Sequence, residues 1–360
     1  MNPREAWSRA MRPRTAALLA ALAGPPARGM MRLPEGVQRR LMRRPTERDG
    51  LLLAPEMQLL LALAERVDPP VDNPAVHAVR RDVEENVRII RGRVVQPVAT
   101  RGLTVAGGMP ARLYEPAGLP PGRGLLVFYH GGGWVIGTLN SHDNLCRFLA
   151  LRAGVRVLSV DYRLAPEAPF PAAVDDAVAA FGWAVEHAAA LAADPRLVGV
   201  GGDSAGGNLS AVVSHQATLG GGPRPAFELL IYPAVDFSVR RRSRELFADG
   251  FFLTDVRIGW FERHYLGAWT DRSDVRLSPL LAGDLSGMPP TYLVTAGFDP
   301  LRDEGEEFAK RLAAAGVPVT LRRQDELIHG FANMFNVSRT ARSAVQEAAA
   351  ALRDGLRPPA

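Results

Sequence analysis

The sequence predicts an α/β fold in which a mostly parallel β-sheet carries helices on both of its faces. Short, nearly continuous apolar runs recur along the chain, as parallel strands with two buried faces require. Segments with the helical period of 3.6 residues alternate with these runs, and this alternation indicates a doubly wound sheet. The runs are Leu125–Tyr129, Val155–Val160, Leu197–Val200, Leu229–Tyr232, Tyr292–Thr295 and Val317–Leu321.

Helices are expected both before and within the sheet. One begins at Pro55 and ends before Pro69-Pro70, and a second is capped by Asn73 and ends at Gly92. A strand-like pattern follows, with a hairpin turn at Gly107-Gly108. The later helical patterns cover residues 174–185, the segment after Ser204, Leu301–Ala315 and residues 345–352.

One segment interrupts this alternation. Between Asp236 and Trp269 the chain places eight of its 25 aromatic residues, which need an apolar surface to bury against. We expect residues 237–289, together with an arm and helices in residues 1–92, to form a cap over the carboxyl edge of the sheet. The sheet domain then comprises residues 93–236 and 290–360. Most of the eight rings are expected to form the small core of the cap.

The positive charge of the chain is confined to its N-terminal arm. Residues 1–50 hold eleven arginines and four acidic residues, or 11 − 4 = +7, so a total of +5 leaves 5 − 7 = −2 for the rest. Dispersed arginines are weak support for nucleic-acid binding, which we do not expect, whereas a weak contact of the arm with a membrane stays open.

Composition excludes several classes of protein. The 360 residues are 47% hydrophobic and 22% charged, as in ordinary globular proteins. No stretch is apolar enough to span a membrane, and the single Cys146, expected in the core, excludes an internal disulfide. No spacing of histidine and cysteine predicts a metal site, and no cofactor is expected. Residues 11–23 form at best a marginal signal peptide, so we expect a cytoplasmic protein, with export or membrane association as alternatives.

A serine between two glycines follows the third apolar run. Ser204 lies in Gly202-Asp203-Ser204-Ala205-Gly206, directly before a helical pattern. A serine in Gly-x-Ser-x-Gly between strand and helix is typical of a nucleophile elbow, in which close backbone packing excludes Cβ atoms at the two glycines. A serine-capped glycine turn is the alternative, but it leaves Gly202 unexplained.

Three glycines after the first run indicate a second functional loop. The sequence His130-Gly131-Gly132-Gly133-Trp134 concentrates flexible backbone at one strand end. Fixed N–H groups in such a loop can stabilise the negative oxygen of a tetrahedral intermediate. A phosphate-binding loop is the alternative, but the accompanying Lys-Ser/Thr or GxGxxG pattern is missing.

The base and acid should follow the serine in the chain. Of the histidines beyond Ser204, His215 lies on the following helix and His264 in the aromatic segment, whereas His329 lies in a loop after the last run. Asp299 comes just after the Tyr292–Thr295 run, and Asp303 is expected on the next helix. We therefore predict His329 as the base and Asp299 as the acid.

Five motifs together resemble those of the hormone-sensitive-lipase-like, bacterial family IV carboxylesterases, in their mycobacterial-type branch with a long N-terminal cap. They are HGGGW (130–134), DYRLAPE (161–167), GDSAGG (202–207), GFDPLRDEG (297–305) and HGF (329–331). The resemblance implies an α/β-hydrolase fold with an eight-stranded sheet. It also implies an oxyanion hole of Gly132, Gly133 and Ala205, with His130 and Gly131 supporting the loop.

Other residues receive more modest expectations. Asp161, Arg163 and Glu167 should form a structural polar network, and Asp203 should either tune the elbow or cap the helix. Trp134 should either face the alcohol side of a substrate or pack in the interior. The residues expected to line the substrate pocket are Trp134, Phe251 and Phe252.

The expected function is hydrolysis of short- to medium-chain acyl esters through an acyl-enzyme intermediate, without metal or cofactor. Amide or lipase activity, a non-catalytic binding protein on the same scaffold, and an arm that tethers the enzyme are the alternatives. The resemblance also leaves a homodimer open.

Overall fold

The computed structural model describes residues 33–42, 44–65, 74–90 and 92–358. Its centre is an eight-stranded sheet in the order β10-β9-β8-β7-β5-β6-β4-β3. Strands β5 to β10 are parallel, and β4 and β3 are added antiparallel at one edge. This confirms the predicted fold class. The strands are β3 (Val98–Val105), β4 (Met109–Pro116), β5 (Arg123–Tyr129), β6 (Arg156–Val160), β7 (Ala193–Asp203), β8 (Glu228–Ile231), β9 (Thr291–Phe298) and β10 (Val319–Ile328).

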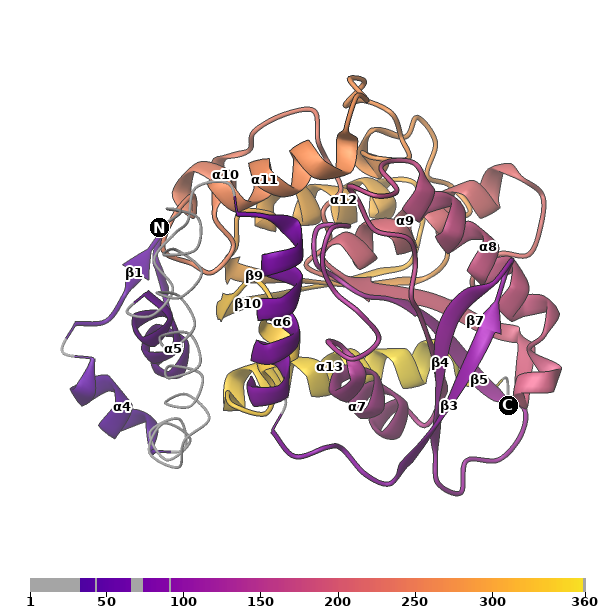
Figure 1. The fold of residues 1–360 in the computed structure, drawn as a ribbon, viewed down its shortest axis with the longest axis horizontal. Coiled ribbons are helices and arrows are strands. Elements are labelled where there is room, and N and C mark those ends of the chain that lie inside the picture. Colours follow the sequence, from indigo (N-terminus) through magenta and orange to yellow (C-terminus); the bar gives the residue numbers. More distant parts are fainter. Residues whose placement is uncertain (1–32, 43, 66–73, 91, 359–360) are drawn as a thin grey trace, which may run out of the picture.

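Helices cover both faces of the sheet, and each face has its own core (Figure 1). Leu126 and Phe128 of β5 belong to one apolar cluster, whereas Leu125, Val127 and Tyr129 belong to another. This alternation explains why the strand is apolar throughout. The helices on one face are α7 (Asp143–Ala153) and α13 (Arg339–Gly355), and those on the other are α8 (Ala172–Glu186), α9 (Ala205–Leu219) and α12 (Arg302–Ala314).

The last strand differs from its prediction. Strand β10 runs from Val319 to Ile328, whereas the sequence predicted burial on both faces over Val317–Leu321. Among the described strands β10 pairs only with β9, and its residues are exposed or half-buried until Leu327 and Ile328, which are buried. The expectation of two buried faces was wrong here because β10 is an edge strand.

The N-terminal segment lies beside the β9–β10 end of the sheet (Figure 1). The predicted start of the second helix at Pro74 lies two residues before the observed start of α6, and its capping Asn73 is outside the described residues. The hairpin turn at Gly107-Gly108 is confirmed between β3 and β4. The elements of this segment are α4 (Glu35–Leu41), β1 (Glu47–Arg48), β2 (Leu51–Leu52), α5 (Pro55–Glu65) and α6 (Val76–Ile90).

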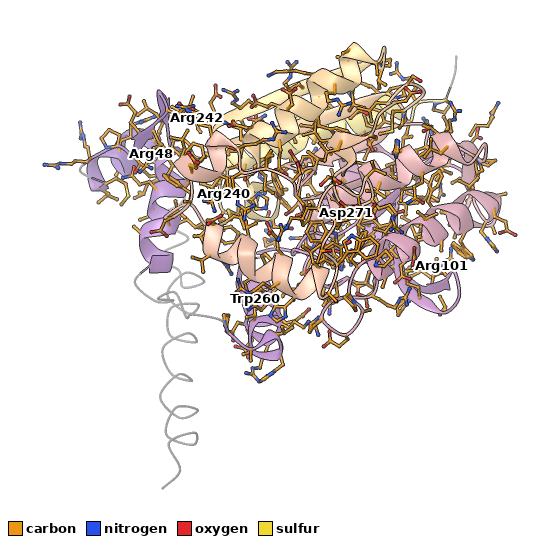
Figure 2. All side chains as sticks on the ribbon, turned by 90° about the horizontal axis from the view of Figure 1, so that it is seen from above. Arg48, Arg101, Arg240, Arg242, Trp260 and Asp271 are labelled. Carbon is orange, nitrogen blue, oxygen red and sulfur yellow. The ribbon has the colours of Figure 1, made fainter. Side chains whose placement is uncertain are left out.

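Residues 237–289, all of which the structure describes, contribute no strand to the sheet. They form α10 (Arg242–Leu246), α11 (Asp255–Leu266) and the short helix Pro279–Leu281. Trp260 of α11 donates from Nε1 to the Pro74 carbonyl oxygen, which brings α11 beside the start of α6 (Figure 2). Tyr265 stacks on Trp134 at 4.3 Å, and Phe247 packs against Phe298. These rings therefore bury against the sheet domain as well as against one another.

The arginine-rich stretch and the residues 11–23 that resemble a leader lie largely or wholly within residues 1–32, outside the described residues. Among the helices that the structure describes, none combines the length and the apolar character needed to cross a bilayer.

Candidate active site

Ser204 lies at a sharp turn between β7 and α9. Its backbone has φ 55° and ψ −117°, a strained conformation for a residue with a side chain. The turn packs so closely on β5 that a Cβ atom at Gly206 would lie 1.8 Å from the carbonyl oxygen of Tyr129, and one at Gly202 would lie 2.3 Å from it. The two flanking glycines are therefore required by contact, as the sequence pattern predicted.

His329 connects Ser204 with Asp299. Its Nε2 lies 3.0 Å from Ser204 Oγ, and its Nδ1 lies 2.7 Å from Asp299 Oδ2. Asp299 is fully buried at the end of β9, and its Oδ1 accepts a hydrogen bond of 2.8 Å from the Leu301 amide. His329 directly follows β10. Three strand ends thus bring together the three side chains that the sequence singled out.

The alternative residues lie elsewhere. Asp303 accepts hydrogen bonds from Arg302 and from the Ser243 amide, away from the imidazole. His215 lies on α9, where burial lowers its pKa, and His264 packs edge-on against Trp260 of α11. Asp299 and His329 are the candidates that the structure brings together with Ser204.

The glycine loop after β5 presents N–H groups near Ser204. Gly132 has φ 121° and Gly133 has φ 58°, both in the region that favours glycine. Their N–H groups, and that of Ala205 at the first position of α9, donate to no other group within the described part of the chain. The first N–H groups of a helix have no partner in the helix itself, so the Ala205 amide is free to bind an anion.

Asp203 and His130 hold this loop. Asp203 Oδ1 accepts from the Gly131 amide at 2.9 Å, so this carboxylate neither caps α9 nor faces solvent. His130 Nδ1 lies 2.8 Å from the Gly131 carbonyl oxygen, and its ring stacks on Tyr162 at 4.4 Å. Burial lowers the pKa of His130 to about 4, with the nearby His142 contributing, so its imidazole is neutral at ordinary pH. These contacts fit the supporting role expected of His130 and Gly131.

His142 belongs to the same network and was missed in the sequence. Its Nε2 lies 3.0 Å from Asp203 Oδ1 and 3.1 Å from Asn333 Nδ2, close to the loop that carries His329. Burial alone would raise the pKa of Asp203, but His142 and the Gly131 amide outweigh it, and the pKa lies below its usual value. A histidine nine residues beyond Gly133 carries no spacing that would have identified it.

The three residues predicted to line the pocket have different surroundings. Trp134 is buried between Tyr265 and Phe237, so it packs in the interior. Phe251 is buried against Phe298, in the packing between cap and sheet. Phe252 is 42% exposed, and a Cβ at Gly330, next to His329, would lie 2.9 Å from its Cε1.

Phe261 is a neighbour of the site that the pocket prediction omitted. A Cβ atom at Gly133 would lie 2.3 Å from Cγ of this ring, which α11 holds over the glycine loop. Phe252 and Phe261 are thus aromatic side chains that flank the site at the His329 loop and at the glycine loop, respectively. The dense aromatic segment contained the signal, but the sequence did not distinguish its members.

Asp161, Arg163 and Glu167 do not bond to one another in the described structure. Arg163 pairs with Asp176, and Glu167 forms a two-point ion pair with Arg80 of α6. Arg80 also donates from Nε to the Val135 carbonyl oxygen at 2.8 Å. Arg163 and Glu167 therefore have structural polar roles, as expected, but each bonds to a partner on another element and not within the motif. Arg80 instead joins α6 to the glycine loop.

Among the described residues, no group of three histidine, cysteine or acidic side chains could hold a metal ion. The chemistry open to the site is that of a hydroxyl group activated by an imidazole and a carboxylate.

Residues 126–333, more than half of the chain, match a protein family whose description is "alpha/beta hydrolase fold". The chain belongs to the α/β-hydrolase family. The match includes the glycine loop, the Ser204 elbow, Asp299 and His329. Membership confirms the resemblance drawn from the five motifs and the fold expected from them.

Several relatives in this family are described as ester hydrolases. The carboxylic ester hydrolase LipN of Mycobacterium tuberculosis is 47% identical over 86% of this chain and 84% of its own length. The ethyl acetate hydrolase of Pseudomonas putida is 39% identical over 73% of this chain and 85% of its own. An ester hydrolase from the metagenome of Lake Arreo, solved with a bipyridine phosphonate derivative, has a TM-score of 0.81 and 40% identity, and the match covers 84% of this chain and 98% of that one.

Proposed function

We propose that this protein is a serine carboxylesterase that hydrolyses short- to medium-chain acyl esters through an acyl-enzyme intermediate. The observation that carries the proposal is the position of His329, within hydrogen-bond distance of Ser204 Oγ on one side and of Asp299 on the other. The descriptions of the relatives as carboxylic ester hydrolase and ethyl acetate hydrolase support the same reaction.

Acylation begins when Ser204 Oγ attacks the ester carbonyl carbon. His329 Nε2 removes the hydroxyl proton as the new C–O bond forms, while Asp299 accepts from Nδ1 and stabilises the imidazolium. Asp299 also fixes the ring tautomer, since its carboxylate faces the protonated nitrogen. The attack converts the carbonyl oxygen into an oxyanion.

The oxyanion is bound by the N–H groups of Gly132, Gly133 and Ala205. Their loops are fixed before substrate arrives, so stabilising the charge requires little reorganisation. His329 then gives its proton to the leaving alcohol, and the acyl group stays on Ser204. Water attacks the acyl-enzyme with the same base and the same N–H donors, which releases the acid and restores Ser204.

Two aromatic rings support a preference for small acyl groups. Phe261 lies against Gly133, and Phe252 lies beside Gly330, so both flank the reacting groups. Of the three residues expected to line the pocket, we propose that only Phe252 contacts substrate, while Trp134 and Phe251 support the walls through packing. The name of the ethyl acetate hydrolase is consistent with a small substrate.

The division into a sheet domain (93–236 and 290–360) and a cap (1–92 and 237–289) is part of the proposal. The absence of sheet strands from described residues 237–289 and the contact of Trp260 with Pro74 support it. A homodimer, which the resemblance leaves open, would form through the edge of β10, which among the described strands pairs with β9. The cytoplasmic location and a membrane contact of the arm stay predictions, because residues 1–32 lie outside the described part.

The test is hydrolysis of p-nitrophenyl esters from acetate to hexanoate by the full chain. We expect turnover by the native protein and by Ser273→Ala, a change at an exposed loop serine, and none above background for Ser204→Ala. A fluorophosphonate probe should label the first two proteins and not the third. Turnover by Ser204→Ala would remove the proposed nucleophile, and failure of the native protein to react with the probe would favour a non-catalytic binding protein. Parallel assays with p-nitroacetanilide and with long-chain esters separate amidase and lipase activity from esterase activity.

A further inference from the structure

The loop that carries Asp299 is held by an N-terminal hairpin to which no sequence motif assigns a role. We propose that Asp49, at the tip of the β1–β2 hairpin, is a positioning residue that fixes Asp299 by way of Arg302. This inference rests on the proposed function, because it takes Asp299 as the acid beside His329.

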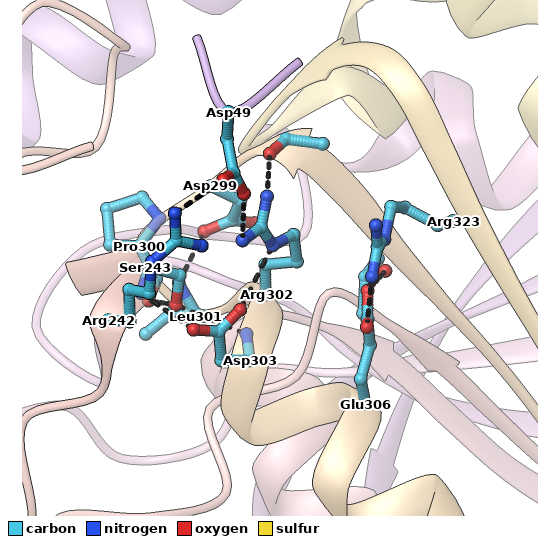
Figure 3. A network of polar contacts seen from close by, with 12 residues as sticks. Asp49, Arg242, Ser243, Asp299, Pro300, Leu301, Arg302, Asp303, Glu306 and Arg323 are labelled. Carbon is cyan, nitrogen blue, oxygen red and sulfur yellow. Dashed lines mark hydrogen bonds and ion pairs between the residues drawn. The ribbon is translucent and has the colours of Figure 1, made fainter. Parts of the chain in front are cut away.

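Asp49 joins three separate parts of the chain. Its Oδ2 accepts a hydrogen bond of 2.9 Å from Arg302 of α12, and its Oδ1 accepts one of 2.6 Å from Arg242 of α10 (Figure 3). In Figure 2, Arg48 and Arg242 lie near each other at the same end of the molecule, where Arg48 also donates to the Leu246 carbonyl oxygen. The hairpin is therefore attached to both the cap and the sheet domain at this point.

Arg302 connects Asp49 to the loop that carries Asp299. It donates from its guanidinium to the Gly297 carbonyl oxygen at 3.2 Å, and its amide donates to the Asp299 carbonyl oxygen at 3.1 Å. The side chain is only 4% exposed and lies over the ring of Phe247. A buried guanidinium needs an opposite charge, and loss of one partner leaves it poorly compensated. Without Asp49, Arg302 would keep Asp303 as its remaining ion-pair partner and would be expected to shift toward it.

The loop that carries Asp299 is held both by internal contacts and by contacts from other elements. The Asp299 carboxylate is oriented by the Leu301 amide, which belongs to the same loop and moves with it. Besides His329, Ser243 of the cap holds the loop by donating to the Pro300 carbonyl oxygen, and Asp49 holds it by binding Arg302 (Figure 3). Of these contacts, the one with Asp49 places a negative charge beside the buried guanidinium of Arg302.

Asp49 keeps this charge over the whole range in which the enzyme would work. Hydrogen bonds from Arg242 and then from Arg302 lower its pKa to about 2. The clasp formed by Asp49, Arg242 and Arg302 is therefore a permanent feature at neutral pH, and it does not act as a pH switch.

The test compares Asp49→Asn with Glu47→Gln, a matched change at an exposed residue of the same hairpin. With active sites counted by fluorophosphonate, we expect kcat of Asp49→Asn to fall roughly tenfold, because small displacements of a catalytic group are costly. KM should stay within about twofold, since Asp49 does not touch substrate. Glu47→Gln should match the native protein, and an unchanged kcat for Asp49→Asn would overturn the proposal.

Two further measurements separate positioning from general destabilisation. In an Asp299→Asn background, Asp49→Asn should cause no additional loss of kcat, whereas an undiminished tenfold loss would overturn a role through Asp299. The low-field proton resonance of His329 Nδ1 should shift or broaden in Asp49→Asn and stay unchanged in Glu47→Gln. This resonance tests the clasp even if the native protein hydrolyses no ester, an outcome that would refute the proposed function alone.

A milder variant covers the case in which Asp49→Asn does not fold. Arg242→Gln removes one of the two arginines from the exposed side, where the Arg242 side chain is 64% exposed, and uncovers no buried charge. We expect the same shift of the His329 resonance and a fall in kcat of roughly threefold, in keeping with an exposed ion pair. A native resonance together with a native kcat in this variant would overturn the proposal.

Discussion

The two sides of the proposed active site, the nucleophile side at Ser204 and the acid side at Asp299, are held in place by different kinds of contact. On the nucleophile side, the support comes mostly from the motifs themselves: Asp203, next to Ser204, binds the Gly131 amide, and Gly206 packs on Tyr129. On the acid side, the Asp299 loop depends on Asp49 and on Ser243, which come from the N-terminal hairpin and the cap.

The difference shows that a motif can carry its own geometry only where its residues contact one another. The elbow and the glycine loop leave neighbouring strands of the sheet, so their contacts connect short segments that resemble the family. The acid loop lies nearer the edge of the sheet, beside the N-terminal hairpin and α10. Its geometry is therefore completed by residues outside any motif.

The largest expected effect is on the acid side. Asp299→Asn should lower kcat by roughly 10⁴-fold, because an amide cannot hold the imidazole in the productive tautomer. Asp303→Asn is the matched control, since Asp303 is the other acidic candidate and bonds to Ser243 and Arg302 instead. We expect it to lose less than roughly tenfold, as for a contact outside the reacting groups. A greater loss for Asp303→Asn in steady-state assays of p-nitrophenyl butyrate would reverse the assignment.

On the nucleophile side, Gly132→Ala should lower kcat by roughly 10²–10³-fold, the usual cost of losing an oxyanion donor. The new Cβ would lie 2.2 Å from the Ile136 carbonyl oxygen, so the loop must move. Gly182→Ala on α8, where no atom lies within 4 Å of the new Cβ, is the control and should keep native turnover. A Gly132→Ala protein with native kcat and a native circular dichroism spectrum would remove Gly132 from the oxyanion hole.

Arg80 tests whether the nucleophile side is as independent as the contacts suggest. Arg80→Met removes the hydrogen bonds from α6 to the Val135 and Ala165 carbonyl oxygens, and we expect kcat to fall by roughly tenfold through loosening of the glycine loop. Glu167→Gln removes the carboxylate partner but leaves both carbonyl contacts, so its effect should be smaller. Equal losses in the two variants would show that the ion pair, and not the contact with the loop, is what matters.

The smallest catalytic effect is expected at Glu228, which lies at the start of β8, far from both sides of the site along the strand. Burial raises the pKa of this carboxyl to about 7, above its ordinary value of 4.5. Between these values the unfolded chain has released the proton that the folded protein retains, so stability falls as pH rises from about 4.5 to about 7.

For a pKa shift of this size, the loss in free energy of unfolding is on the order of 3 kcal/mol. Glu228→Gln should abolish this loss and leave kcat unchanged. Urea unfolding at pH 5 and pH 8 measures the effect, and Glu186→Gln at the end of α8 serves as a surface control. If the native protein and Glu228→Gln changed equally in stability between the two pH values, Glu228 would not be a buried titrating group. An altered kcat would show that the core beneath β8 affects the active site.

The sequence was most informative where one residue type satisfies a local requirement. Ser204 and its flanking glycines could be identified because a tight turn on a neighbouring strand leaves no space for side chains, and chain order then selected Asp299 and His329. The continuous apolar runs identified the inner strands for the same reason, since two buried faces leave a simple pattern. The prediction of two buried faces was wrong at β10, because this edge strand is partly exposed to solvent.

The parts that could not be predicted depend on contacts between distant residues. Helix α7 was not predicted from the sequence, although its residues Leu145 and Phe148 are buried in the core. His142 and Arg80 act through partners that only the folded chain brings near, and nothing in the residues around Asp49 indicates Arg302, 253 positions later. Among eight clustered aromatic residues, the sequence could not single out Phe261 as the one above the glycine loop.

The contact between Asp49 and Arg302 has a consequence for biosynthesis. The hairpin leaves the ribosome 253 residues before its partner in α12, and the base after β10 follows later still. A nascent chain can thus complete the serine elbow long before it can complete the acid loop, and contacts of such high sequence separation form slowly. The growing polypeptide would therefore remain inert toward cellular esters until the residues that follow β10 have also left the ribosome.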